Sequence, residues 1–242
     1  MKREAVSLSS SLERGLKMYT LAASAAGVAA LALAQSAEGK IVYTPADVKI
    51  GYEGANPYFL DINHDGVADF MFSFHSGLDA PGLDVCPALR SDQRYCSFGT
   101  GEFSNQIRGY PDNSPFGWAS ALLSGARIAP NRKHFVKYNF QMATMRCKSG
   151  CTYARGPWAN ESHKSRYLGF KFAIGESIHY GWARLRVKVD LKNSTFSGTL
   201  TGYAYETIPN KPIRAGQTHG KDDATLGRLA QGASAVSNGG KP

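Results

Sequence analysis

The chain has 242 residues, of which 43% are hydrophobic and 19% are charged, and its formal net charge is +9. This composition is that of an ordinary globular protein with a sizeable core, so it excludes an intrinsically disordered chain. The basic residues do not form the Lys/Arg runs that are typical of nucleic-acid-binding modules, and we therefore expect no nucleic-acid partner.

Residues 1–34 have the pattern of a secretory signal peptide. Basic residues precede an apolar run at 18–34, which is rich in alanine and ends in a small-x-small cleavage motif. We expect cleavage after Ala34 or Ala37, and therefore a secreted or cell-surface protein. The run is at the short limit for a membrane span, so an uncleaved anchor is the alternative. No later stretch of the sequence is long and apolar enough to cross a bilayer.

Residues 61–69, with the sequence DINHDGVAD, have the side chains that a calcium-binding loop needs. Oxygen-bearing side chains occupy positions one, three, five and nine, and the glycine at position six allows a sharp turn. The loop departs from the EF-hand at position twelve, where Phe72 replaces a bidentate Glu, and it resembles the shorter calcium loops of FG-GAP and thrombospondin type 3 repeats. An Asx-rich turn without metal is the alternative. We expect a structural calcium ion whose ligands are Asp61, Asn63, Asp65, the carbonyl oxygen of Val67, and Asp69.

Four cysteines follow the predicted signal peptide, and an even number in an exported chain indicates disulfides. Three pairings are possible. We favour Cys86–Cys96 with Cys147–Cys151, because each bond then closes a short loop. The alternative for the second pair is half of a metal site, although the chain lacks a second ligand pair at suitable spacing.

The clearest pattern in the chain is a three-stranded meander at 167–207. Its middle strand, 178–189, alternates between two kinds of side chain with period two, which is typical of a half-buried antiparallel strand. Turns are predicted at 175–177 and 192–194, where Gly, Asn and Ser tolerate tight backbone geometry. Because strands with one apolar face must cover it, we expect a second sheet.

The other face of the meander carries an aromatic and basic strip, formed by Tyr180, Trp182, Arg184 and Arg186, with Tyr203 or Tyr205 expected beside them. Aromatic rings stack on sugars and arginines bind carboxylates or sulfates, so the strip is a candidate site for an acidic polysaccharide. The alternative, which we favour, is that the loop at 156–158 or the N-terminal strands cover the two aromatic rings and that the basic residues form a solvated outer face.

Further short strands are predicted at 40–43, 48–52, 58–60, 70–74 and 135–145, whereas 75–130 is predicted to be mostly loop. About eight strands with long connections predict an all-β fold, an antiparallel β-sandwich of jelly-roll type with disulfide-tied loops. The expected organisation is a signal peptide at 1–34, a β-sandwich domain at 35–214 and a flexible tail at 215–242.

Four short motifs in the second half of the chain together carry a family resemblance: GPW at 156–158, YLGFKF at 167–172, HYGWAR at 179–184 and GYAYET at 202–207. On these segments the chain resembles a family of exported bacterial proteins that often carry PEP-CTERM sorting tails. The resemblance implies export, a β-rich domain and a place at the cell surface or in the extracellular matrix, with no established activity. Residues 224–233 resemble the segment of small residues and leucine in such a sorting tail, but the Pro-Glu-Pro motif that should precede it is missing. We therefore expect release or loose association with the envelope instead of anchoring.

No catalytic constellation is found in the sequence, since its histidines lack metal-ligand spacing and it has no nucleophile elbow, phosphate loop or dinucleotide motif. The first hypothesis is therefore a non-enzymatic, calcium-stabilised component of the cell envelope or extracellular matrix. The second is a carbohydrate-binding module that uses the aromatic and basic strip. The third is a polysaccharide-active enzyme of jelly-roll type, with its acids among Glu102, Glu161, Glu176 and Glu206.

Overall fold

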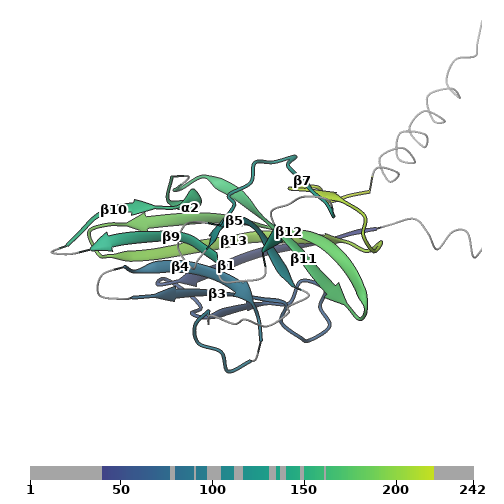
Figure 1. Ribbon diagram of the computed structural model, residues 1–242, viewed down its shortest axis with the longest axis horizontal. Coiled ribbons are helices and arrows are strands. Elements are labelled where there is room, and N and C mark those ends of the chain that lie inside the picture. Colours follow the sequence, from purple (N-terminus) through teal and green to yellow (C-terminus); the bar gives the residue numbers. More distant parts are fainter. Residues whose placement is uncertain are drawn as a thin grey trace, which may run out of the picture. The chain divides into compact units, whose positions relative to one another are not determined.

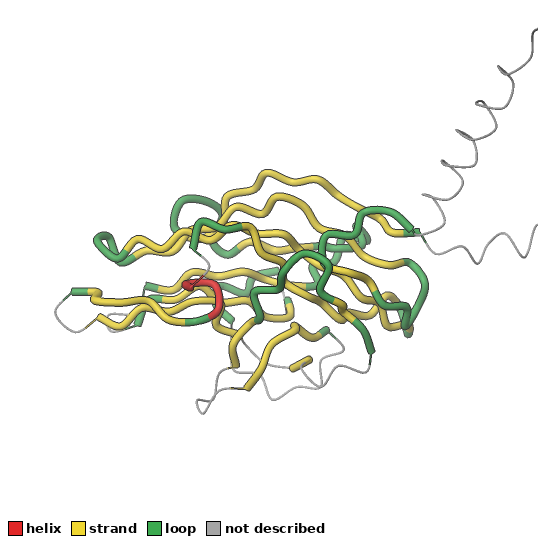
Figure 2. The backbone as a smooth tube through the Cα atoms, turned by 90° about the horizontal axis from the view of Figure 1, so that it is seen from above, coloured by secondary structure: helices red, strands yellow, loops and turns green. Residues whose placement is uncertain are grey.

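The computed structural model describes residues 40–76, 80–89, 91–96, 105–111, 117–130, 135–136, 140–147, 150–160 and 162–220. The predicted signal peptide and most of the predicted tail lie outside these residues. Strands make up most of the described chain, and its only α-helix is a single turn (Figures 1 and 2). The all-β prediction is confirmed.

The described elements follow one another along the chain in this order: β1 (Ile41–Gly51), β2 (Tyr58–Leu60), β3 (Phe70–His75), β4 (Gly82–Pro87), β5 (Gln106–Pro111), β6 (Gly117–Ala119), β7 (Arg127–Ile128), β8 (Phe135–Val136), β9 (Phe140–Cys147), β10 (Cys151–Arg155), α2 (Pro157–Asn160), β11 (Ser165–Ile174), β12 (Ser177–Asp190), β13 (Thr195–Glu206) and β14 (Ile213–Arg214).

Twelve of these strands form one hydrogen-bonded sheet in the order β1-β13-β12-β11-β5-β6-β9-β4-β3-β2, with β10 paired to β9 and β8 paired to β5. Among the described strands, β6 and β9 are the only parallel pair. The start of β5 pairs with β11 and its end pairs with β6. A strand that passes from one sheet to another in this way forms a corner, so β5 joins the two halves of the sandwich.

The two halves of the sheet meet at one large apolar core. Phe70 of β3 and Phe170 of β11 stack within it, with ring centroids 4.1 Å apart, and both side chains are fully buried. Leu83 and Leu185 reach the same core from opposite halves. Removing these apolar side chains from water provides the main driving force for bringing the two halves together.

The predicted meander is confirmed as β11, β12 and β13, which pair in antiparallel register. Ile174 pairs with Ser177, so the connection between β11 and β12 has two residues. Gly175 begins this turn with a φ of 58°, a left-handed conformation that two-residue hairpin turns require and that glycine adopts without strain. A bulge interrupts the pairing of β12 with β13 between Arg184 and Leu185.

The structure corrects several predicted strand boundaries. The two short strands predicted at 40–43 and 48–52 are one continuous strand, β1, whose pairing with β13 shifts register between Pro45 and Val48. Proline lacks a backbone N–H, and β1 tolerates it because it is an edge strand with a bulge at that point. The segment predicted to be mostly loop, 75–130, contains β4 to β7. The strand predicted at 135–145 divides into β8 and β9, and 137–139 lie outside the described residues.

A separate two-stranded antiparallel ribbon, formed by β7 and β14, covers the outer face of the meander. Its isoleucines, Ile128 and Ile213, are buried in a second apolar cluster with Tyr180 and Trp182 of β12. Around Tyr180 and Trp182 the meander is therefore buried on both faces. The packing also continues beyond the predicted domain end at 214, because Ala215 is only 2% exposed, and the structured domain extends to residue 220 at least.

Candidate functional site

The predicted calcium loop connects β2 to β3 as a tight turn that is organised around Asp61. The two carboxylate oxygens of Asp61 accept backbone N–H bonds from His64 at 2.7 Å, Asp65 at 3.3 Å and Gly66 at 2.8 Å. Gly66 has a φ of 86° and open space where a side chain would begin. Only glycine adopts this conformation freely, which explains its place at the sixth position.

The remaining predicted ligands are arranged around the same turn. Asn63 donates a side-chain hydrogen bond to Asp65 at 2.8 Å, and Asp65 accepts the backbone N–H of Val67 at 2.8 Å. The Oδ1 atom of Asn63 is buried and has no hydrogen-bond partner. An orphaned buried oxygen of this kind is costly unless something binds it. The Val67 side chain is 69% exposed and makes no contribution to the core.

Asp69 closes the loop from the interior. It is 6% exposed, and its Oδ2 accepts the backbone N–H of Ile62 at 2.9 Å. Burial raises the pKa of Asp69 to about 6, and the negative charges of Asp65 and Asp61 act in the same direction. The amide of Asn105 lies 3.4 Å from Oδ1 of Asp69 and offsets part of this effect.

The residues of this loop fit a hard cation by their chemistry. All predicted donors are oxygens, as calcium prefers, and one of them is the unpartnered Oδ1 of Asn63. In the part of the chain that the structure describes, however, no three Asp, Glu, His or Cys side chains converge closely enough to hold a metal ion. The oxygens of Asp61 and Asp65 are instead engaged by backbone N–H groups of the turn.

His64 fastens the loop to the neighbouring strands. Its Nε2 atom lies 2.8 Å from Oγ1 of Thr44 on β1, and its ring packs on Tyr203 of β13 with centroids 5.7 Å apart. His64 has a φ of 62°, an uncommon conformation for a residue other than glycine. His64 is thus exposed to solvent and at the same time anchors the turn to two strands.

The aromatic and basic strip does not form an exposed binding surface. Trp182 is 1% exposed and Tyr180 is 2% exposed, so neither ring face is free to stack on a sugar. Tyr43 of β1 stacks on Trp182 with ring centroids 5.9 Å apart, and the indole N–H donates to the carbonyl oxygen of Gln217 at 3.1 Å. The covering residues therefore come from β1, as one alternative expected, and also from the C-terminal ribbon.

The other members of the strip are separated from one another. Arg184 is half-buried and donates to the side-chain and main-chain oxygens of Thr201, at 2.7 and 3.1 Å. Tyr203 pairs with Ala183, and since cross-strand partners share a face, it lies on the core side of the sheet. Arg186 alone is exposed among the five predicted residues. The sequence placed Tyr203 wrongly because it could not show the bulge after Arg184.

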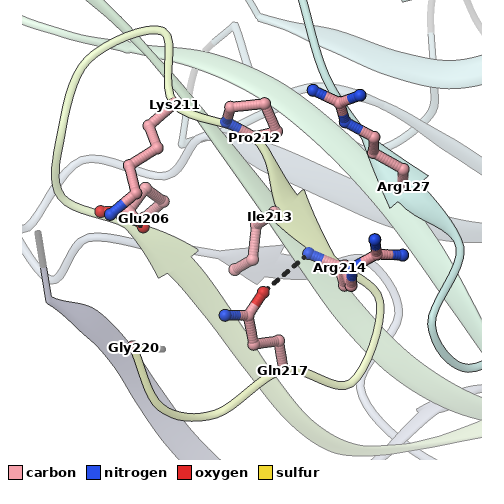
Figure 3. Close-up of a pocket in the computed structure, with 8 residues that line it drawn as sticks. All are labelled: Arg127, Glu206, Lys211, Pro212, Ile213, Arg214, Gln217 and Gly220. Atoms are coloured by element: carbon pink, nitrogen blue, oxygen red, sulfur yellow. Dashed lines mark hydrogen bonds and ion pairs between the residues drawn. The ribbon is translucent and has the colours of Figure 1, made fainter. Parts of the chain in front are cut away.

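A polar hollow of about 450 Å³ lies beside the β7–β14 ribbon (Figure 3). Figure 3 shows Arg127 and Arg214 on one side of it and Lys211 with Glu206 on the other. Glu206 is 2% exposed and lies 3.3 Å from the ammonium group of Lys211. Gln217 accepts the backbone N–H of Arg214 at 3.1 Å and so holds the lower edge in place.

Sequence reasoning missed this hollow for two reasons. The arginines come from strands of only two residues, which show no periodicity, and these strands lie far apart in the chain. The sequence offers one signal: an arginine stands next to an isoleucine in both segments, Arg127-Ile128 and Ile213-Arg214. One apolar and one charged neighbour are typical of a strand with one buried face.

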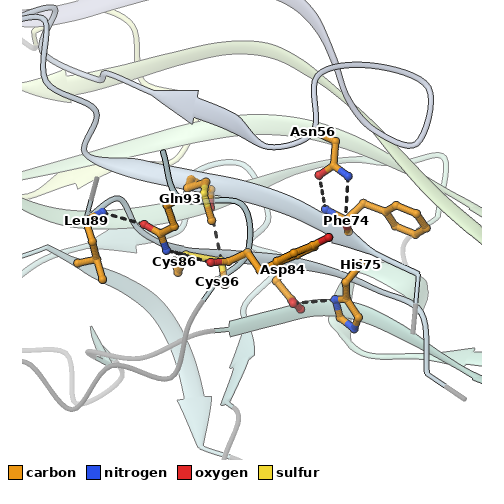
Figure 4. The surroundings of a disulfide bond; sticks show 10 residues. Asn56, Phe74, His75, Asp84, Cys86, Leu89, Gln93 and Cys96 are labelled. Atoms are coloured by element: carbon orange, nitrogen blue, oxygen red, sulfur yellow. Dashed lines mark hydrogen bonds and ion pairs between the residues drawn. A yellow bond between two sulfur atoms is a disulfide. The ribbon is translucent and has the colours of Figure 1, made fainter. Parts of the chain in front are cut away.

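Both predicted disulfides are confirmed, Cys86–Cys96 and Cys147–Cys151. The first ties the end of β4 to the segment that follows it, and both of its cysteines are buried against Met71 (Figure 4). In the same segment, Oε1 of Gln93 accepts the backbone N–H of Leu89 at 3.0 Å. The second disulfide closes the short connection between β9 and β10, where Cys147 and Cys151 are paired in register.

A partly buried pair of His75 and Asp84 lies near the first disulfide (Figure 4). Nδ1 of His75 is 3.0 Å from Oδ2 of Asp84, and Nε2 of His75 is 3.0 Å from the carbonyl oxygen of Ala80. The hydrogen bond to Asp84 raises the pKa of His75. Burial raises the pKa of Asp84 more than the His75 hydrogen bond lowers it. Oδ1 of Asp84 and Oγ of Ser73 are both buried without a hydrogen-bond partner.

A scan against protein-family models finds no match for this chain, and searches of curated proteins and of solved structures find none either. Within the described residues, no helix has the length and apolarity that crossing a bilayer requires. The loop, the disulfides and the polar hollow are the features of the described chain that bear on its function.

Proposed function

We propose that this chain is an exported, non-enzymatic β-sandwich protein that is stabilised by calcium and serves as a component of the cell envelope or extracellular matrix. The observation that carries the proposal is the pair of disulfides, Cys86–Cys96 and Cys147–Cys151. Such bonds persist in oxidising compartments and are rare where the cytosol keeps thiols reduced. The signal-like segment at 1–34 and the resemblance to exported PEP-CTERM-associated proteins favour the same location.

The proposed calcium ion has a structural role at the turn between β2 and β3. Its ligands are Asp61, Asn63, Asp65, the carbonyl oxygen of Val67, and Asp69. A divalent cation would offset the mutual repulsion of three carboxylates that lie within one short turn, and it would give the orphaned Oδ1 of Asn63 a partner. Because the turn is held on β1 and β13 through His64, the ion would brace the edge of the sandwich.

Thermal unfolding in the presence of calcium and of a chelator tests the metal. Calcium that binds only the folded state at about one hundred times its Kd adds about 2.7 kcal/mol of stability, so the chelator should lower Tm clearly. Asp61→Asn combined with Asp65→Asn should abolish this difference. Asp47→Asn, an exposed aspartate on β1, is the matched control and should keep it. Equal Tm values for the wild type in both conditions would remove calcium from the proposal.

The location is tested independently by fractionation of the producing cell and by thiol labelling of the recovered protein. We expect the chain in the medium or on the cell surface, with all four cysteines resistant to labelling until a reductant is added. Recovery of a reduced, full-length chain from the cytosol would contradict the proposal.

A second candidate function, binding of an acidic polysaccharide, is favoured by the polar hollow beside β14.

A further inference from the structure

The β7–β14 ribbon has two unlike faces, and this fixes the position of its arginines. Ile213 pairs with Ile128, and both side chains are buried under the ribbon against Tyr180 and Trp182. Because neighbouring residues of a strand point to opposite faces, the anchored isoleucines hold Arg127 and Arg214 on the outer face. Both arginines are exposed there, at the edge of the hollow.

The two arginines stand directly opposite each other, since Arg214 pairs with Arg127 in the register of the ribbon. Like charges at directly opposite positions of two strands destabilise the pairing. Arg214 donates to the carbonyl oxygen of Gly125 at 3.1 Å, but neither guanidinium has a carboxylate partner in the described part of the chain. An anion bound by both would offset this repulsion, and the planar guanidinium suits a carboxylate in particular.

The rest of the hollow suits a sugar better than a small free ion. Its volume of about 450 Å³ is in the range of pockets that enclose small organic ligands. The ammonium group of Lys211 and the second amide hydrogen of Gln217 offer donors for hydroxyl groups. Glu206 is already engaged by Lys211 and by the backbone N–H of Ile208, so its part is to hold Lys211 in place. The ring of Pro212 adds a small apolar surface between them (Figure 3).

We propose that this hollow binds a uronate residue of an acidic polysaccharide, with Arg127 and Arg214 on the sugar's carboxylate and with Lys211 and Gln217 at its hydroxyl groups. The inference rests on the proposed function in one respect, since such a polymer lies outside the cell. The proposed polysaccharide site thus lies on the β7–β14 ribbon, which covers Tyr180 and Trp182, and not on the strip of β12 itself. A sulfated sugar carries a related oxyanion, and the experiment below separates the two.

The test is isothermal titration calorimetry of the full mature chain at low ionic strength with four probes: a uronate trisaccharide, a neutral trisaccharide, a sulfated trisaccharide and inorganic phosphate. We expect measurable binding of the uronate only, with affinity that falls as salt is added. Arg127→Gln combined with Arg214→Gln should weaken it by at least about tenfold, because two charge-assisted hydrogen-bonding groups are lost.

The matched control is Arg186→Gln combined with Lys192→Gln, which removes the same charge from two exposed positions on the meander. We expect its affinity to stay within about twofold of the wild type, as for other exposed charges. Arg127→Gln alone guards against misfolding, because within the described residues Arg127 is bonded through its backbone, whose carbonyl oxygen accepts from Arg108 at 2.9 Å. It should keep the wild-type Tm and still weaken binding.

Three results would overturn the inference: no binding of the uronate, an equal loss in the control variant, or binding of phosphate or the sulfated sugar as tight as that of the uronate. A failure here is distinguishable from a failure of the proposed function. The arginine variants should retain the full calcium dependence of Tm, which depends on residues 61–69 and on none of the residues of the hollow.

Discussion

The backbone N–H of Ile62 donates to Oδ2 of Asp69 across the turn between β2 and β3, at 2.9 Å. Ile62 is 1% exposed and belongs to the main core, so this bond joins the loop to the interior of the sandwich. Asp69 is thus the member of the loop whose position depends most on burial, whereas Asp61 and Asp65 organise the exposed turn.

Asp69→Ala should lower the free energy of unfolding by about 1 to 3 kcal/mol even without calcium, because it leaves the buried N–H of Ile62 without a partner. Urea unfolding in the presence of chelator measures this effect. Asp47→Ala, at an exposed position of β1, should change the same quantity by less than about 0.5 kcal/mol. Equal effects of the two substitutions would mean that the Asp69–Ile62 bond contributes nothing specific.

Trp182→Phe should destabilise the protein by about 1 to 3 kcal/mol, because it removes the hydrogen bond to Gln217 and part of the packing against Tyr43. Because the buried Trp182 does not touch the sugar, any loss of uronate binding should be smaller than that of Arg127→Gln and should act through Gln217. Tyr153→Phe, at a 47% exposed position on β10, is the control and should be close to neutral. A loss of binding without a loss of stability would restore the strip as a binding surface.

The two disulfides should contribute unequally to stability. In the chain-entropy model, loss of Cys86–Cys96, with a sequence separation of 10, costs about 3 kcal/mol, and loss of Cys147–Cys151, with a separation of 4, costs about 2 kcal/mol. Double Cys→Ala variants, compared by urea unfolding, check this order. Burial of Cys86 with Met71 should widen the difference. The reverse order would indicate that the covalent loop length does not control the effect.

The His75–Asp84 pair should make stability depend on pH around neutrality. The pKa of His75 is raised above its ordinary value of 6.5 by the hydrogen bond to Asp84. Its contribution to stability is therefore complete below pH 6.5 and is lost as the pH rises through the higher folded-state pKa. The free energy of unfolding of the wild type should thus fall on the alkaline side of 6.5.

Asp84→Asn should abolish or reverse this fall, because it removes the charge that holds the proton on His75 and leaves the burial that opposes it. Urea unfolding at a series of pH values on either side of 6.5 measures the slope. His219→Gln, which alters an exposed histidine, should keep the wild-type slope. A slope that is unchanged in Asp84→Asn would assign the pH dependence to another group.

The meander could be predicted from the sequence because its strands are long and carry strict alternation. Ala183, Leu185 and Val187 face the core as their spacing indicated. The disulfide pairing could be predicted as well, since short loops favour local bonds. The strands β4 to β7 escaped prediction because they are short and carry no continuous period-two pattern.

The sequence favours a covered Tyr180 and Trp182, but local pattern could not show which residues cover them. Alternation shows that two faces differ, but Tyr180 and Trp182 are apolar enough to be buried and polar enough to be exposed. Their cover comes from Ile128 and Ile213, which stand alone in two-residue strands far away in the chain. The pairing of Arg127 with Arg214 follows from that same long-range contact, so the hollow became visible only in three dimensions.

Residues 213–217 cover part of Trp182, and in the sequence they come after every long strand of the sheet. During synthesis from the N-terminus, this part of the cover over the indole is therefore made after the meander itself. A chain that is cleaved between Glu206 and Ile213 would expose part of this aromatic cluster to proteases and to other protein chains, whereas the intact chain keeps it buried.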